Sequence, residues 1–187
     1  MIGIPLGLLY ANAAEWAIHK YILHGVGKDR KRFFSFHWHE HHRNSRQDEG
    51  FDVDYTKPLL RWTAPGKELA ALTALGIVHL PLFAVAPFFA SAAVYGAVNY
   101  YRVHKKAHLD PEWARKHVPW HVDHHMGPNQ DANWCVTKPW FDIILGTRER
   151  YVGTVRELED GQRKSLRKAK RTQRARSISA GQVLQPA

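Results

Sequence analysis

The chain has 187 residues, of which 27 are Lys or Arg, 17 are Asp or Glu and 13 are His, and its formal net charge at pH 7 is +10. This length suits one domain with its own core and leaves no room for a separate reductase or cofactor-binding domain. The single cysteine, Cys135, excludes an intramolecular disulfide and the cysteine-rich zinc modules, and it indicates a reducing compartment.

Two apolar stretches predict membrane-spanning helices. Residues 2–18 carry one charge, that of Glu15, and residues 69–101 carry none. The second stretch is too long for one span and suits two short helices with a turn at Pro87. We therefore predict spans at about residues 2–18, 69–85 and 88–103. The first stretch lacks the basic segment that begins a signal peptide, so we expect it to be an anchor.

Ten of the histidines fall into four short clusters along the chain. They are His19 and His24, then His37, His41 and His42, then His104 and His108, and then His121, His124 and His125. Neutral imidazole is the commonest metal ligand in proteins, and ten are too many for one tetrahedral ion. The clusters therefore predict a site for two metal ions.

The spacing within the clusters indicates helices. Residues four apart lie on one helix face and can present two nitrogens to one ion. Such pairs are His37 with His41, His104 with His108, and His121 with His125, which His124 joins; His42 and His125 extend their pairs toward a second ion. A five-residue step rotates by roughly 140°, so the helix that carries His19 is expected to end or bend at His24, beside Gly25.

These clusters resemble the histidine boxes of the membrane-bound fatty acid hydroxylase/sterol desaturase superfamily. The matching words are His-Lys-Tyr-Ile-Leu-His-Gly at 19–25, His-Trp-His-Glu-His-His at 37–42, His-Lys-Lys-Ala-His at 104–108 and His-Val-Asp-His-His at 121–125. The stretch from Asn133 to Thr147 is similar to the one that follows the last box in this family, and the resemblance runs from about Glu15 to Thr147. The second box can be read from His37 or from His39, and the family pattern fits His37.

The resemblance implies an all-α integral membrane protein with a cytoplasmic cap of box helices that holds two iron ions. Imidazole ligands alone suit iron, copper, nickel or zinc, and zinc could replace iron in a purified sample. The activity implied is O2-dependent hydroxylation or desaturation of a fatty acyl chain or sterol, with electrons from a separate ferredoxin or cytochrome b5. One alternative is a carotenoid ring hydroxylase, whose first box is similar. Another is a non-catalytic membrane metal-binding protein.

Several other residues are candidates for contacts to the metal-bound rings. They are Glu15, His39, Glu40, His117, Asp123 and Asn133. An acid that accepts the remaining N–H of a metal-bound imidazole fixes the orientation of the ring. His39 and His117 fall off the box spacing, so we expect them to contact the rings or to lie at the surface rather than to bind the metal. For Glu40, a solvated position on a helix surface is an equal alternative. His79 lies within the apolar hairpin, and we expect it to be a hydrogen-bonded residue outside the metal site.

The distribution of charge predicts the orientation of the protein in the membrane and the role of its C-terminal tail. Basic residues crowd the segment 20–67 and the chain after Arg102, while none lies near Pro87, so all four boxes should face the cytoplasm. We divide the chain into a membrane di-iron domain, 1–152, and a basic, disordered tail, 153–187. Residues 161–176 carry eight basic side chains and no acid, which suits anionic lipid headgroups. No aromatic residue interleaves them, so nucleic acid is not expected.

Overall fold

The computed structural model describes residues 2–183, which form helices and connecting loops without a β-strand among them. The elements are α1 (Gly3–Ala17), η1 (Ile18–Gly25), η2 (Val26–Lys28), η3 (His37–His41), α2 (His42–Gln47), η4 (Val53–Thr56), α3 (Ala64–His79), α4 (Leu82–Val85), α5 (Pro87–Leu109), α6 (Pro111–His117), α7 (Pro119–Met126), α8 (Trp140–Ile144) and α9 (Val155–Val183). The prediction of an all-α protein is confirmed. The chain divides into two compact units, 1–152 and 153–187, and each is described by itself.

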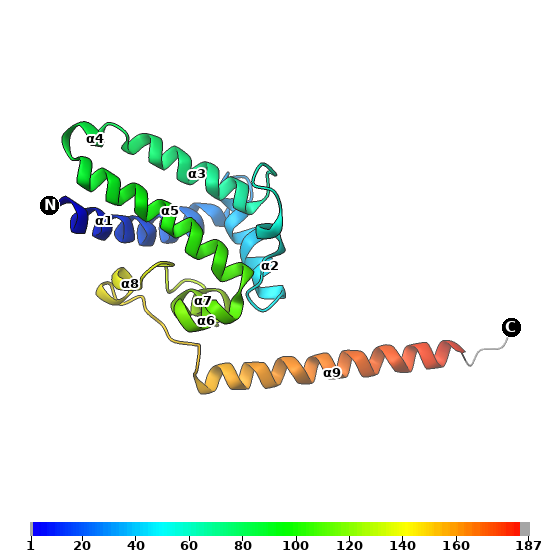
Figure 1. The fold of residues 1–187 in the computed structure, drawn as a ribbon. Helices are drawn as coiled ribbons and strands as arrows, with labels where there is room; N and C mark the ends of the chain where they lie inside the picture. The colour runs from blue at the N-terminus through cyan, green and yellow to red at the C-terminus, as the bar shows by residue number, and fades with distance from the viewer. Residues whose placement is uncertain (1, 184–187) are drawn as a thin grey trace. The chain divides into compact units, whose positions relative to one another are not determined.

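Helix α5 is the centre of the first unit, because α1 and α3 both pack against it (Figure 1). The contact with α1 is very close. A Cβ added to Gly96 would lie 2.4 Å from the Cβ of Ala11, and one added to Gly7 would lie 2.7 Å from the Cβ of Ala92. Small residues on both helices therefore allow their backbones to approach.

The predicted hairpin differs in detail from the observed one. The chain turns between α3 and α5 through residues 80–86, and Pro87 is the first residue of α5. A proline is favourable there, since the first helical residue has no partner for its N–H. Helix α5 continues to Leu109, so His104 and His108 lie on it. Within residues 2–183, no helix combines the length and the apolar character needed to cross a bilayer.

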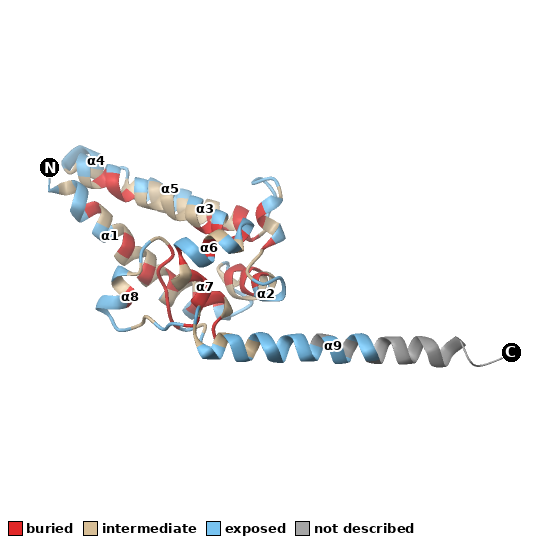
Figure 2. Ribbon diagram, turned by 60° about the horizontal axis from the view of Figure 1, so that its bottom comes forward, coloured by how far each residue is buried: buried red, intermediate tan, exposed pale blue. Residues whose placement is uncertain are grey.

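The segment after α5 packs against the N-terminal helices of the first unit. Five of the eight residues of α7 are buried and the other three are half-buried, whereas α4 has no buried residue (Figure 2). The loop after α7 packs Trp134 and Cys135 against Trp16 of α1. The histidine-bearing elements η1, η3, α5 and α7 thus meet beneath this loop.

The second unit contains helix α9 (Val155–Val183). We expected a disordered tail from residue 153, and the structure has a helix instead. A helix is compatible with this composition because Arg, Lys, Leu and Ala have high helix propensity. The expectation of disorder at residues 184–187 lies outside the described residues.

Candidate metal centre

The structure brings all ten box imidazoles into one buried cluster. Their exposed fractions are 2% or less. Nine of them form two groups, within each of which the potential ligand atoms lie within 4.8 Å of one another. The first histidine group consists of His19, His24, His37, His42 and His124, and the second histidine group consists of His41, His104, His108 and His125. His121 adjoins the second group, with its Nε2 3.0 Å from Nε2 of His108.

Two π-helices, η1 and η3, produce this division. Hydrogen bonds in a π-helix join residues five apart, which places such residues on one face. His19 and His24 are five apart in η1 and lie together in the first histidine group. His37 and His42 follow the same rule at η3. His24 therefore turns inward because the helix widens into a π-helix. The sequence predicted instead that the helix would end or bend at this residue.

The pairing that we expected within the second box does not hold. His37 and His41 are four apart, and the π-helix directs them to different groups. Residues four apart do stay together in the regular helices: His104 and His108 on α5 belong to one group, and His121 lies beside His125 with ring centroids 4.6 Å apart. The two groups are neighbours, since the rings of His42 and His125 stack with centroids 4.3 Å apart.

Close contacts between ring nitrogens indicate places for cations. Nε2 of His19 lies 2.9 Å from Nε2 of His37, and Nε2 of His42 lies 3.1 Å from those of both His24 and His124. Two nitrogens bound to one ion at about 2.1 Å and at a right angle are about 3.0 Å apart. The observed separations match that geometry.

Buried nitrogens without partners point in the same direction. Within the described part of the chain, Nε2 of His41, Nε2 of His104 and both ring nitrogens of His125 have no hydrogen bond. An unpaired buried polar atom costs about 1–3 kcal/mol, so several in one place need an explanation. All four of these nitrogens belong to the second histidine group; among the described residues, Nδ1 of the adjoining His121 and Nε1 of Trp134 are unpaired as well. The residues present therefore fit two metal ions, one at each group.

Most of the rings are held through Nδ1, which leaves Nε2 for a metal. The acceptors are the carbonyl oxygens of Trp134 (to His19, 2.5 Å), Ala132 (to His124, 2.7 Å) and Gly50 (to His108, 2.8 Å), the side-chain oxygen of Gln130 (to His42, 2.9 Å), and the carboxylates of Asp131 (to His24, 3.4 Å), Asp52 (to His41, 2.9 Å) and Glu68 (to His104, 2.6 Å). Such partners set the tautomer and raise the basicity of the ligand.

Burial favours the neutral form of nine of the box imidazoles. Desolvation lowers the pKa of His37, His41 and His125 well below its ordinary value, and the neighbouring imidazoles lower it further. The same two causes act on His19, His24, His42, His108, His121 and His124. Neutral imidazole is the form that binds a metal, so the site is prepared for one at neutral pH.

Three of the predicted supporting residues brace the loops around the rings. Glu15 accepts hydrogen bonds from the backbone N–H groups of Val136 and Thr137. It does not hold the ring of His19, whose Nδ1 bonds to the carbonyl oxygen of Trp134. Asp123 accepts from the N–H groups of Tyr151 and Val152 and pairs with Arg148. Asn133 accepts from Arg148 and from the N–H of Glu149, and Asp142 accepts from those of Trp134 and Cys135.

The other predicted residues lie outside the metal centre: His39 and Glu40 are half-buried, and His117 is exposed. His39 bonds to the carbonyl oxygen of Lys28, and His117 stacks on Trp113 with ring centroids 4.9 Å apart. Glu40 pairs with Lys67 at 2.8 Å. His79 lies outside both histidine groups, as expected, and bonds to Tyr10 at 2.8 Å.

Sequence reasoning missed Asp52 and Glu68, the two buried acids that hold rings of the second histidine group. Glu68 also accepts a hydrogen bond from Tyr55 at 2.6 Å, and burial together with this acid raises the pKa of Tyr55 well above its ordinary value. One signal was present for Glu68, which is the last acid before the apolar stretch that begins at Leu69. Asp52 lies in a polar loop among other acids, where no local pattern distinguishes it.

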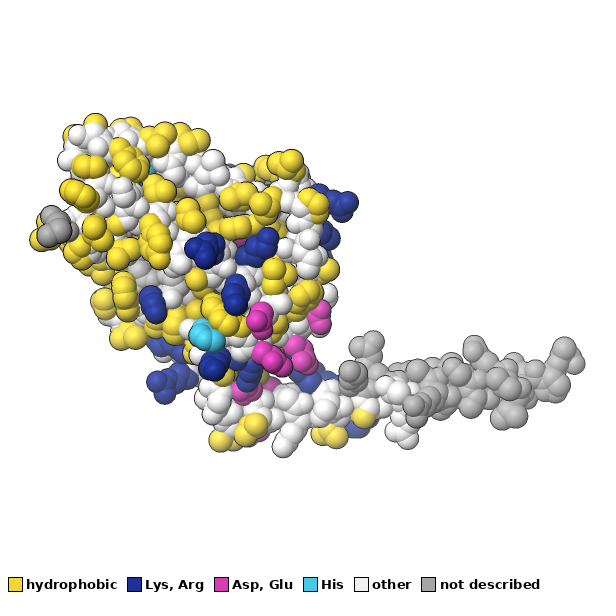
Figure 3. All heavy atoms as spheres, viewed as in Figure 1, with side chains coloured by type: hydrophobic (Ala, Val, Ile, Leu, Met, Phe, Trp, Pro, Cys, Tyr) yellow, Lys and Arg dark blue, Asp and Glu magenta, His cyan; other side chains and the backbone are white. Residues whose placement is uncertain are grey.

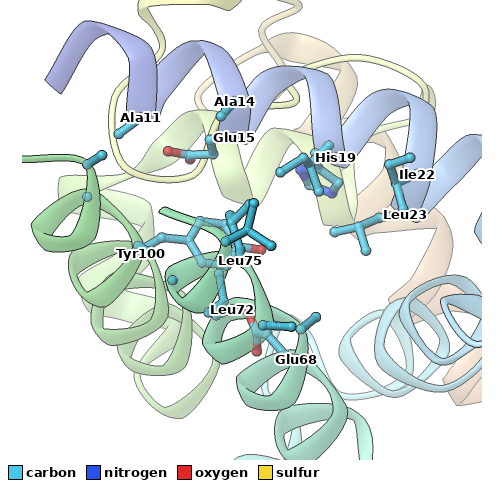
Figure 4. A pocket seen from close by; sticks show the side chains of 18 of the residues that line it. Ala11, Ala14, Glu15, His19, Ile22, Leu23, Glu68, Leu72, Leu75 and Tyr100 are labelled. Carbon is cyan, nitrogen blue, oxygen red and sulfur yellow. The ribbon is translucent and has the colours of Figure 1, made fainter. Parts of the chain in front are cut away.

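A cavity of about 420 Å³ leads to the first histidine group. It lies between α1, η1, α3 and α5, and most of its lining is apolar (Figure 4). His19 and His37 reach it from the metal centre, and Glu15, Glu68 and Tyr100 line it near that end. The volume falls within the range of about 300–1,000 Å³ that small-molecule sites occupy. A long apolar molecule in this cavity would have one part of its chain beside the metal centre.

Comparison with known proteins identifies the family. The model of the family described as Fatty acid hydroxylase matches residues 4–147, which include all ten box histidines and the loop that braces them. Neither a curated protein nor a solved structure matches the chain. Since the match covers well over half of the sequence and ends at Thr147, where the resemblance predicted from the boxes also ends, the chain belongs to the fatty acid hydroxylase family.

Proposed function

We propose that the protein is an O2-dependent oxygenase that oxidises a C–H bond of a long apolar lipid at a centre of two iron ions. The observation that carries this proposal is the apolar cavity that ends on His19 and His37 of the buried histidine cluster. An unactivated C–H bond resists acid–base attack, so a redox metal beside an apolar cavity suits its oxidation.

Two iron ions bound by the two histidine groups would supply the electrons and the Lewis acidity needed to activate O2. For hydroxylation, the substrate and O2, with two electrons and two protons from outside, give an alcohol and water. For desaturation, the same reactants give an alkene and two molecules of water. The residues of this chain hold the ions, orient the imidazoles and exclude bulk water from the buried centre. A separate ferredoxin or cytochrome b5 would deliver the electrons.

We propose that the first unit lies in a membrane with its histidine boxes on the cytoplasmic side. Exposed apolar side chains support this placement: Ile2, Val78, Val85 and Phe88 are 75%, 73%, 79% and 58% exposed. On the face seen in Figure 3, hydrophobic side chains cover the end of this unit that α4 and the start of α1 form. Exposed apolar patches of this kind mark interaction or membrane surfaces.

Helix α9 suits the surface of an anionic membrane. Its sequence is strongly basic, and Leu158 and Leu166 are exposed apolar residues eight apart, hence near one another around the helix. We propose that this helix lies on lipid headgroups. A peptide of residues 153–187 should bind anionic vesicles, and added salt should weaken the binding; equal binding to zwitterionic vesicles would contradict the proposal.

Lipid mass spectrometry of cells with and without expression tests the oxygenase. We expect a host lipid to gain the mass of one oxygen atom, or to lose that of two hydrogen atoms, when a compatible electron donor is co-expressed. His124→Ala removes a ligand from the first histidine group and His41→Ala one from the second. Each should lower this product by orders of magnitude, because no neighbouring imidazole can replace the lost ligand.

The matched control is His117→Ala, which removes a histidine that stacks on Trp113 at the surface and should leave the product unchanged. Near-normal product from both His124→Ala and His41→Ala would overturn the proposal. No lipid change with either electron donor, combined with full metal binding, would favour a non-catalytic metal-binding protein. A product that appears only in cells that make carotenoids would favour the ring hydroxylase.

A further inference from the structure

The cavity has a second polar end, formed by Tyr10 and His79. Both residues line it, and both lie away from the histidine groups along their helices. Tyr10 precedes His19 by nine residues, which is about 13 Å at the rise of an α-helix. On α3, Glu68 marks the metal end because it holds the ring of His104, and His79 lies about 16 Å further along the same helix. The apolar length of the cavity therefore separates the metal centre from this pair.

The hydrogen bonds of the pair define what it can recognise. Nδ1 of His79 lies 2.7 Å from the carbonyl oxygen of Leu75, which can only accept, so this nitrogen carries the ring proton. Nε2 then accepts from the hydroxyl of Tyr10 at 2.8 Å. The oxygen of Tyr10 keeps lone pairs to accept a further hydrogen bond. The pair therefore presents an acceptor, and a ligand that uses it must donate.

The other polar groups of the cavity are committed to the protein. The oxygens of Glu15 accept from Val136, Thr137 and Asn12. Those of Glu68 accept from Tyr55 and His104. The hydroxyl of Tyr100, which also lines the cavity, bonds to Glu68. These groups bind the framework around the centre, so Tyr10, which is 39% exposed, and His79 are the polar pair at the far end of the cavity that is suited to a ligand.

We propose that Tyr10 and His79 bind a hydroxyl group at one end of the substrate and so select which carbon reaches the metal centre. The ligand class is an apolar lipid with a hydroxyl group about 13–16 Å from the carbon that is oxidised. This inference rests on the proposed function, because it takes the cavity to be the substrate site. A ligand with a ketone, ester or ether at this end lacks the donor and would lose the contact.

A photoreactive probe tests this without relying on turnover. The probe is a straight-chain primary alcohol that carries a diazirine about 13 Å from its hydroxyl, and its methyl ether is the matched ligand without a donor. With the full-length protein, the alcohol should crosslink to the segment 19–37 at the metal end. The ether should label both ends of the cavity, and it should need a concentration about 2- to 10-fold higher for half-maximal labelling, as expected for one lost hydrogen bond.

The double variant Tyr10→Phe, His79→Leu removes both acceptors, whereas Tyr10→Phe alone leaves Nε2 of His79 free to accept. In the double variant the alcohol should label with the distribution and concentration of the ether. Tyr95→Phe, His117→Leu is the control with the same changes outside the cavity lining, and it should label as the parent does.

Identical labelling by alcohol and ether in the parent protein would overturn the inference, as would absence of labelling in the cavity. Failure of the proposed function is seen separately, as an absence of oxidised lipid in expressing cells. The probe reports binding alone, so the two failures are distinguishable.

Discussion

Most of the buried imidazoles in this centre are anchored through Nδ1, which leaves Nε2 available. The quality of the anchor differs between rings. Asp52 is fully buried and lies 2.9 Å from Nδ1 of His41, while Asp131 is 53% exposed, lies 3.4 Å from Nδ1 of His24 and also pairs with Lys28. A shielded carboxylate at short distance orients its ring more strongly than one shared with water and a lysine.

Asp52→Asn should therefore weaken metal binding at the second histidine group by about 10- to 100-fold. The amide keeps the shape of the side chain but loses the charge that makes His41 a better ligand. Metal content after dialysis against increasing chelator measures the effect. Asp131→Asn is the matched change at the weaker anchor and should have a much smaller one. Equal losses in the two variants would show that burial of the acid does not matter.

The sequence was informative about which residues form the centre and less so about how they divide. Box spacing singled out ten imidazoles, because repeated histidines at helical intervals are rare by chance, and these ten lie together. The anchors Asp52 and Glu68 come from segments between the boxes. Their role depends on a tertiary fold that local spacing does not encode.

At the scale of elements, close packing of α1 on α5 determines where His19 lies relative to His104. Gly96 has no room for a methyl group against Ala11, whereas Gly76 on α3 has no atom within 4 Å of an added Cβ. Substitution of Gly96 therefore tests the packing between the helices, and substitution of Gly76 tests helix propensity alone. The apolar stretches predicted these helices, but the π-helical turns were missed, because a five-residue spacing looks like a helix end when regular geometry is assumed.

Gly96→Ala should lower the free energy of unfolding by about 1–3 kcal/mol through overpacking. Gly76→Ala should raise it by up to about 1 kcal/mol, since alanine is the better helix former. Thermal unfolding of the detergent-solubilised protein compares them. Adding Ala11→Gly to Gly96→Ala reopens the space and should return the stability close to that of the parent. If both single variants shift the midpoint in the same direction, the contact between the helices is not limiting.

At the scale of the first unit, an apolar end and a histidine-rich end follow from the order of segments along the chain. The proposed topology places Lys31, in the loop before the second box, in the cytoplasm and Val85, at the end of α4, on the other side. Cys135 cannot report on this arrangement, because it is fully buried and burial raises the pKa of its thiol. It is therefore a silent background for introduced cysteines.

With an impermeant thiol reagent, Val85→Cys should be labelled in intact cells and Lys31→Cys only after lysis. Val85 is 79% exposed and Lys31 is also exposed, so access within the folded chain does not limit either site. The parent protein should stay unlabelled in both conditions. Labelling of Lys31→Cys in intact cells at the rate seen after lysis would mean that the boxes face outward, which would rule out a cytoplasmic electron donor.

The widened turns at η1 and η3 have a consequence for anyone who wishes to copy this centre. In an ideal α-helix a five-residue step rotates the side chain by roughly 140°, so the two histidines of His-x4-His do not face one ion. Transplanting the boxes onto a regular designed bundle would therefore misdirect one histidine of each such pair. A working copy of the centre therefore has to reproduce the π-helical backbone as well as the imidazoles. The one additional residue in each such hydrogen-bonded turn is as necessary to the design as the histidines.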